Sequence, residues 1–133
     1  MDNLKYTFEV YANKEDILIA RFKQLITGPE ENAKQAELVV AELISIVRQS
    51  PGKKFNVLID LMPLKEASYI SDRTREIYIQ AMKDEQLRKL AVIGESSAYR
   101  EVLNFLIATI KGDSKIRWFT DVKKAIGWLK QDR

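Results

Sequence analysis

The chain has 133 residues, of which 46% are hydrophobic, so its composition is that of one ordinary globular domain and excludes disorder. Its 22 Lys and Arg against 19 Asp and Glu leave a formal charge of +3, which is too mild for a dedicated nucleic-acid-binding protein. There is no Cys and no His, which excludes disulfides, Cys-based metal sites, and Ser-His-Asp or Cys-His catalysis. We therefore expect neither a metal nor a cofactor.

No apolar stretch reaches the length of a transmembrane segment. The first ten residues alternate polar and apolar side chains, whereas a signal peptide has a basic start and a continuous apolar run. We therefore expect a cytoplasmic protein that forms a single domain over residues 1–133.

The first part of the chain predicts a β-hairpin followed by a helix. Residues Lys5–Tyr11 alternate in polarity, as a half-buried strand does, and Ile17–Phe22 form a second strand after a short polar turn. The short connection favours antiparallel pairing. Pro29 suits the first turn of a helix, whose apolar residues recur at steps of three and four until about Gln49.

The rest of the chain alternates strands with helices. Short apolar runs predict buried strands at Phe55–Leu61, Lys89–Gly94 and Lys115–Phe119. A helix is predicted after each of them, the first capped by Ser71, the second by Ser96 or Ser97, and the last by Thr120. The order ββαβαβαβα predicts an α/β fold with a mixed, mostly parallel sheet of about five strands and four main helices.

Three stretches of this pattern carry a family resemblance. They are the strand Asn56–Leu61, the strand Leu90–Gly94 that leads into a helix, and the ending Trp118–Val122 followed by the helix stripe Ala125–Leu129. Together they resemble the STAS-like fold of the anti-sigma-factor antagonists, in particular a divergent bacterial branch without an assigned activity. The resemblance covers nearly the whole chain and implies the fold much more strongly than any activity.

In regulatory members of this family, a partner kinase phosphorylates a serine in an Asp-Ser-Ser-Gly motif at the start of the helix that follows the matching strand. That event controls binding to an anti-sigma factor. The resemblance places Ser71 at this position, but the sequence here is Ser71-Asp72-Arg73-Thr74, without the serine pair or the glycine. Two interpretations of Ser71 stay open, a phosphorylation site and an ordinary N-cap.

In open α/β sheets, ligands bind outside the carboxyl ends of the parallel strands. That edge holds Asp60, Gly94 and Glu95, with Ser96 and Ser97 at the start of the next helix. Gly94 lets the backbone turn, and the following helix offers N–H groups, so these serines form either an anion site or a plain strand-to-helix turn. Asp60 has no paired carboxylate or base nearby in the sequence, and we expect it to accept hydrogen bonds from loop amides.

The stretch Val102–Ile110 is apolar nearly all round a helix. Either the protein's own core covers Phe105 and Ile107, or these side chains face a second subunit, a protein partner or a lipid-like ligand. The following residues, 111–133, carry a net charge of +4. This charge would suit an anionic membrane surface or an acidic partner, or would form an ordinary solvated face.

Three hypotheses for function follow. The first is a non-catalytic regulatory module that acts by protein–protein binding, with a protein partner or as a homodimer. The second is a binder of a small apolar or lipid-like ligand, which predicts an apolar cavity with a few polar groups. The third is an enzyme, which predicts converging polar side chains with perturbed ionisation. From the sequence alone we rank the protein-binding module first.

Overall fold

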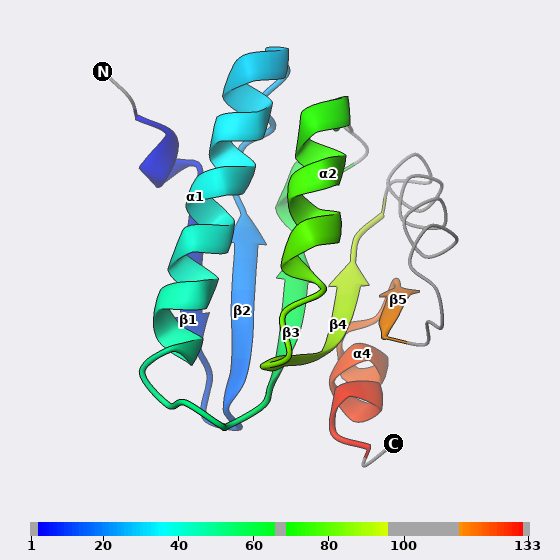
Figure 1. Cartoon of the computed structure of the whole chain (residues 1–133). Coiled ribbons are helices and arrows are strands. Elements are labelled where there is room, and N and C mark those ends of the chain that lie inside the picture. Colours follow the sequence, from blue (N-terminus) through cyan, green and yellow to red (C-terminus); the bar gives the residue numbers. More distant parts are fainter. Residues whose placement is uncertain (1–2, 66–68, 96–114, 132–133) are drawn as a thin grey trace.

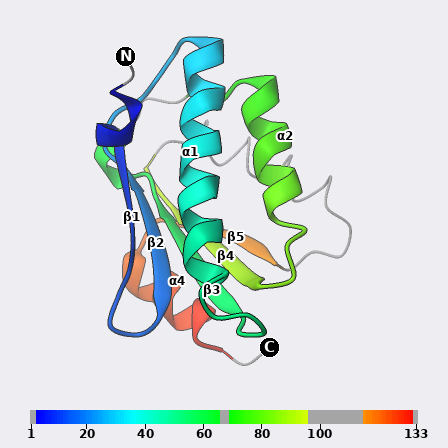
Figure 2. The same ribbon diagram turned by 60° about the vertical axis from the view of Figure 1, so that its left-hand side comes forward.

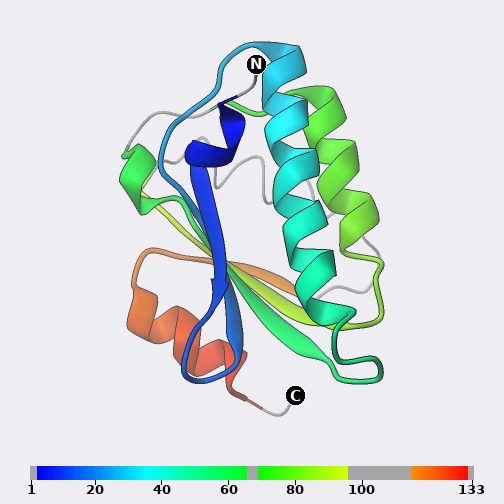
Figure 3. The same ribbon diagram turned by 90° about the vertical axis from the view of Figure 1, so that its left-hand side faces the viewer.

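A five-stranded sheet runs through the middle of the protein, with α1 (Pro29–Val47) and α2 (Asp72–Ala81) on one face and α4 (Val122–Leu129) on the other (Figure 1). The computed structural model describes residues 3–65, 69–95 and 115–131. The two-sided cover is clearest in Figure 3, where the edge strand β1 (Phe8–Ala12) faces the viewer. The α/β fold predicted from the sequence is confirmed.

The strands lie in the sheet in the same order as in the chain. β1 (Phe8–Ala12) pairs antiparallel with β2 (Ile17–Phe22), and the remaining neighbours are parallel: β3 (Phe55–Asp60), β4 (Leu87–Ile93) and β5 (Ile116–Phe119). The predicted hairpin and the mixed, mostly parallel sheet are confirmed. Because β3 and β4 are added in the same direction, the crossover helices α1 and α2 fall on the same face of the sheet, where they lie side by side (Figure 2).

Most expected ends of elements differ by one or two residues, as at β4, which starts at Leu87 and not at Lys89, and two of the differences have a clear cause. The predicted strand from Lys5 begins only at Phe8, because Leu4–Tyr6 form a short 3-10 helix that buries Leu4. The last helix is capped by Asp121 and not by Thr120: the Asp121 carboxylate accepts the backbone N–H of Lys123 at 2.8 Å. A carboxylate one residue later satisfies a free amide of the first turn, so the helix starts one residue further along.

The helix predicted after Gly94 lies outside the described residues, which contain three α-helices instead of the four expected. A second short 3-10 helix, Met62–Leu64, occupies the connector after β3.

The core has two layers because successive side chains of a strand point to opposite faces. From β2, Leu18 and Ala20 pack toward α1, whereas Ile17 and Ile19 pack with the cluster that includes α4. This explains why β2 is apolar almost throughout. Trp128 and its neighbours Ala125 and Leu129 complete the α4 layer.

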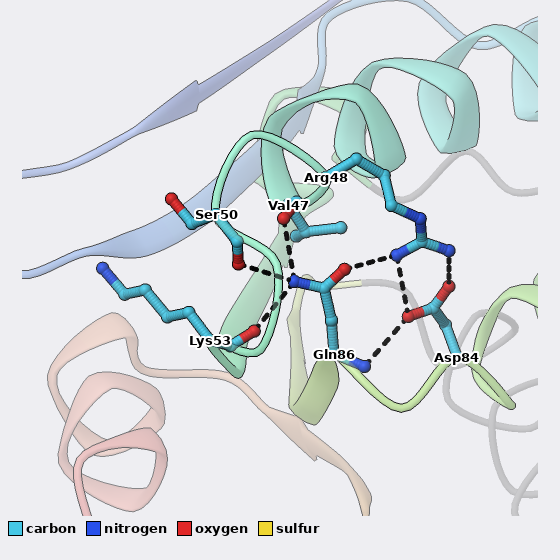
Figure 4. Close-up of polar contacts among 6 residues, drawn as sticks. All are labelled: Val47, Arg48, Ser50, Lys53, Asp84 and Gln86. Atoms are coloured by element: carbon cyan, nitrogen blue, oxygen red, sulfur yellow. Dashed lines mark hydrogen bonds and ion pairs between the residues drawn. The ribbon is translucent and has the colours of Figure 1, made fainter.

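A polar network joins the end of α1 to the start of β4 (Figure 4). The Gln86 side-chain amide donates to the carbonyls of Val47, Ser50 and Lys53 at 2.8–3.0 Å. Arg48 forms an ion pair with Asp84 and donates to Gln86 Oε1. The hydrogen bond from Arg48 lowers the pKa of Asp84, and the same bond raises the pKa of Arg48. The network fixes the spacing between the α1 layer and the sheet.

Candidate functional site: an apolar cavity under α2

A cavity of about 100 Å³, here called the α2 cavity, lies between α2 and the sheet. Ile59, Leu90 and Val92 line it from the strands, and Tyr78 and Ile79 line it from α2. Protein interiors are packed as densely as organic crystals, with few voids larger than a water molecule. The described residues leave a partly open hollow of this size between α2 and the strands, and its presence needs an explanation.

The sequence of α2 accounts for the space beneath it. Four of the first five residues of the helix are charged, so its apolar cover begins only at Ile77. Ile77, Tyr78 and Ile79 are half-buried, and Thr74 is the one fully buried residue within the described helix. α2 packs along α1 (Figure 2), and it offers few apolar side chains to the strands below.

Asn32, in the first turn of α1, is the centre of a buried polar cluster beside the α2 cavity. Its Oδ1 accepts the Ser71 backbone N–H at 3.0 Å and the Thr74 hydroxyl at 2.6 Å. Its Nδ2 donates to the carbonyls of Ile26 at 2.8 Å and Tyr69 at 3.5 Å. An amide has two donor protons and two acceptor lone pairs, so Asn32 is saturated by the protein itself.

Ser71 is the N-cap of α2, as the capping interpretation predicts: its Oγ accepts the backbone N–H of Thr74 at 3.1 Å. The hydroxyl oxygens of Ser71 and Thr74 lie 2.8 Å apart. Because the Thr74 proton is used on Asn32, Ser71 donates its own proton to Thr74. Ser71 is only 8% exposed. Phosphorylation of Ser71 stays a prediction, and it would have to replace this donated hydrogen bond.

Gln35, one turn further along α1, also lines the cavity and is 4% exposed. Its Nε2 donates to Thr7 Oγ1 at 2.9 Å and to the Gln24 carbonyl at 3.4 Å. Thr7 gives its own proton to the Leu4 carbonyl at 2.6 Å, so its oxygen is an acceptor toward Gln35. This arrangement fixes the orientation of the amide, and Gln35 Oε1 has no hydrogen-bond partner within residues 3–65, 69–95 and 115–131.

Asn32 and Gln35 were missed in the sequence, although a signal was present. Both stand on the apolar stripe of α1, four residues before Ala36 and Val39. Amide side chains at core-facing positions are buried polar groups, and buried polar groups need partners.

At the strand edge, the structure shows what Asp60 does. Its Oδ1 accepts the backbone N–H of Met62 at 3.0 Å, the loop-amide contact expected from the sequence. Its Oδ2 accepts Arg21 Nε at 2.9 Å, and Arg21 also lies 3.5 Å from a Glu9 oxygen. The hydrogen bond to Asp60 raises the pKa of Arg21.

Gly94 is needed for a reason other than the expected turn, since its φ is not positive. A Cβ there would lie 3.1 Å from the Trp118 ring and 3.2 Å from Leu61, so the residue lets the Trp118 ring approach the backbone. Glu95 is exposed. Ser96, Ser97, Phe105 and Ile107 lie outside the described residues, and their predicted roles stay predictions.

The candidate acid–base residues do not converge. Asp60 alternates with Ile59, so it points to the α4 face of the sheet, whereas Ser71 caps α2 on the other face. Within the described residues, no hydrogen bond or ion pair joins any two of Asp60, Ser71 and Glu95. The same part of the chain has no group of three acidic side chains placed to hold a metal ion. None of its helices is long and apolar enough to span a bilayer.

Residues 11–133 match the model of a family described as "Domain of unknown function (DUF7793)". The chain belongs to the DUF7793 family. No curated protein matches it.

Among solved structures, this DUF7793 chain is similar to an uncharacterised protein of the DUF3478 family from Shewanella loihica PV-4, which has a SpoIIAA-like fold. The TM-score is 0.61 and the sequence identity 17%, over 92% of this chain and 91% of the other. The SpoIIAA-like fold is STAS-like, so the resemblance found in the sequence is confirmed. At this identity the likeness establishes the fold alone.

Proposed function

We propose that the protein is a non-catalytic binding module that takes a small, mostly apolar ligand into the α2 cavity. The α2 cavity itself carries the proposal. It is apolar over most of its wall and has two buried amides, Asn32 and Gln35, at the start of α1. This is the composition of natural ligand sites, which are concave and apolar with a few placed polar groups.

The volume limits the ligand. An engineered cavity of about 150 Å³ binds benzene, which has six non-hydrogen atoms, so about 100 Å³ corresponds to about four of them, and the partly open cavity extends this to a ring of five. The best small ligands gain about 1.5 kcal/mol per non-hydrogen atom. The dissociation constant for such a molecule would therefore be no tighter than about micromolar.

The test is thermal unfolding and amide NMR of the full chain with cyclopentane, compared with a variant that fills the cavity. Ile79→Phe adds volume at a lining residue, and Ile77→Phe is the matched control, since Ile77 is half-buried on the same helix and is not among the described lining residues. We expect cyclopentane to raise the melting temperature of the unaltered protein and of Ile77→Phe but not of Ile79→Phe. Equal responses of the two variants, or no response of the unaltered protein, would contradict the proposal.

Protein binding, which ranks first on the sequence alone, stays a prediction. It depends on Phe105 and Ile107, which lie outside the described residues. The α2 cavity supports the ligand-binding hypothesis more directly.

A further inference from the structure

The wall of the α2 cavity is uncharged in the part of the chain that the structure describes. Its polar members there are the side chains of Gln24, Asn32, Gln35 and Thr74 and the two tyrosines Tyr69 and Tyr78. A carboxylate or ammonium group in this cavity would lose its hydration without gaining an opposite charge. The wall therefore favours a neutral ligand.

Most of the polar groups at the α1 end of the cavity are already used. The Asn32 amide donates both protons to backbone carbonyls, and its oxygen accepts from Ser71 and Thr74. Thr74 gives its proton to Asn32 and receives that of Ser71. These side chains hold the starts of α1 and α2 together, and they have no donor proton left for a ligand.

Gln35 differs from them because its orientation leaves an acceptor unused. Thr7 has already donated its proton, so the amide must turn its NH₂ group toward Thr7. Oε1 then carries two lone pairs with no hydrogen-bond partner among the described residues, and it keeps some solvent contact although Gln35 as a whole is only 4% exposed. Because Gln35 lines the cavity, a ligand that donates to this acceptor gains a hydrogen bond, whereas a ligand that only accepts does not.

Resting on the proposed function, we infer that the ligand is uncharged and carries a hydrogen-bond donor, such as a hydroxyl group, which Gln35 Oε1 receives. The apolar part of the ligand then lies against Ile59, Val92 and Ile79. Gln35 is thus a specificity-determining residue of the α2 cavity.

Four probes of five non-hydrogen atoms separate these features: cyclopentane, cyclobutanol, cyclobutanone and cyclobutylammonium. They differ in having no polar group, a neutral donor, an acceptor alone, or a charged donor. Dissociation constants are measured on the full chain by NMR titration, following the methyl signals of Ile79 and Met82, which line the cavity. We expect cyclobutanol to bind about three- to tenfold tighter than cyclobutanone, and cyclobutylammonium to bind at least 100-fold more weakly than cyclobutanol.

Gln35→Met keeps the length of the side chain and removes the acceptor. We expect it to abolish the preference for the alcohol over the ketone while cyclopentane still binds. Gln80→Met, at an exposed position of α2, is the control and should keep the preference. If Gln35→Met fails to fold, the alcohol and ketone on the unaltered protein still decide the question.

Equal or tighter binding of the ketone, or binding of the ammonium ion as tight as that of the alcohol, would overturn the inference. Cyclopentane binding in the same experiment would leave the proposed function standing. If none of the four probes binds, the proposed function itself fails.

Discussion

Replacement of Asn32 by alanine tests whether the cluster at the starts of α1 and α2 holds the α2 cavity together. The change removes three hydrogen bonds of 2.6–3.0 Å, to Ser71, Thr74 and the Ile26 carbonyl. Each is worth about 1 kcal/mol, and a buried Ser71 N–H without a partner adds a penalty of its own. We therefore expect a loss of about 3 kcal/mol in the free energy of unfolding, or roughly 10 °C in melting temperature for a chain of this size.

The assay is urea unfolding, in which Asn32→Ala should lower the midpoint without changing the slope. Lys34→Ala, two residues further along the same helix and exposed, is the control and should change stability by less than about 0.5 kcal/mol. A double-mutant cycle with Thr74→Val isolates one bond of the cluster, for which we expect a coupling of about 1 kcal/mol. If Asn32→Ala costs no more than Lys34→Ala, the cluster does not hold the two helices, and the account of the cavity fails with it.

Two further predictions concern packing and pH. Gly94→Ala should cost about 1–3 kcal/mol, because its Cβ would lie 3.1 Å from the Trp118 ring. Gly127→Ala in α4, where a Cβ meets nothing within 4 Å, should stabilise the protein by up to about 1 kcal/mol; calorimetry that finds the same sign for both would refute the packing argument. Since Arg48 lowers the pKa of Asp84 below its ordinary 3.8, the ion pair stabilises the fold fully above that pH and less as the pH falls through the lowered value. Asp84→Asn should therefore flatten the acid limb of a stability–pH curve, and an unchanged limb would show that other carboxylates determine it.

Much of the fold could be predicted because local patterns determine it. The β2 bounds agree at both ends, since an apolar run between polar turns leaves little choice, and Ser71 was identified as a cap from its position before a charged first turn. The incorrect predictions also have physical causes. Residues 4–6 alternate as a strand would, yet Thr7 bonds back to the Leu4 carbonyl and turns them into a 3-10 helix. At α4, Thr120 and Asp121 are both good caps, and only the geometry decides between them.

The site was harder to predict than the fold because the cavity depends on how several helices and strands pack against one another. A general rule for open sheets predicts Asp60 and Gly94 as binding residues. In the structure Asp60 accepts a loop amide, and Gly94 leaves room for the Trp118 ring. The α2 cavity lies deeper, between α2 and the strands. Its lining residues are scattered along the chain between Phe22 and Ile116, so no single stretch of sequence reveals the cavity.

One feature of the sequence nevertheless explains why the cavity exists where it does. The charged start of α2, which makes Ser71 a good cap, also withholds apolar side chains from the strands below until Ile77. A helix that cannot fill the space beneath its first turns needs another way to stay attached, and the polar cluster around Asn32 supplies it. The same residues that anchor α2 therefore keep the cavity open and set its polar end. On this argument Asn32→Ala should weaken cyclopentane binding together with stability, whereas a cavity that the cluster does not hold open would bind cyclopentane in the variant as tightly as in the unaltered protein.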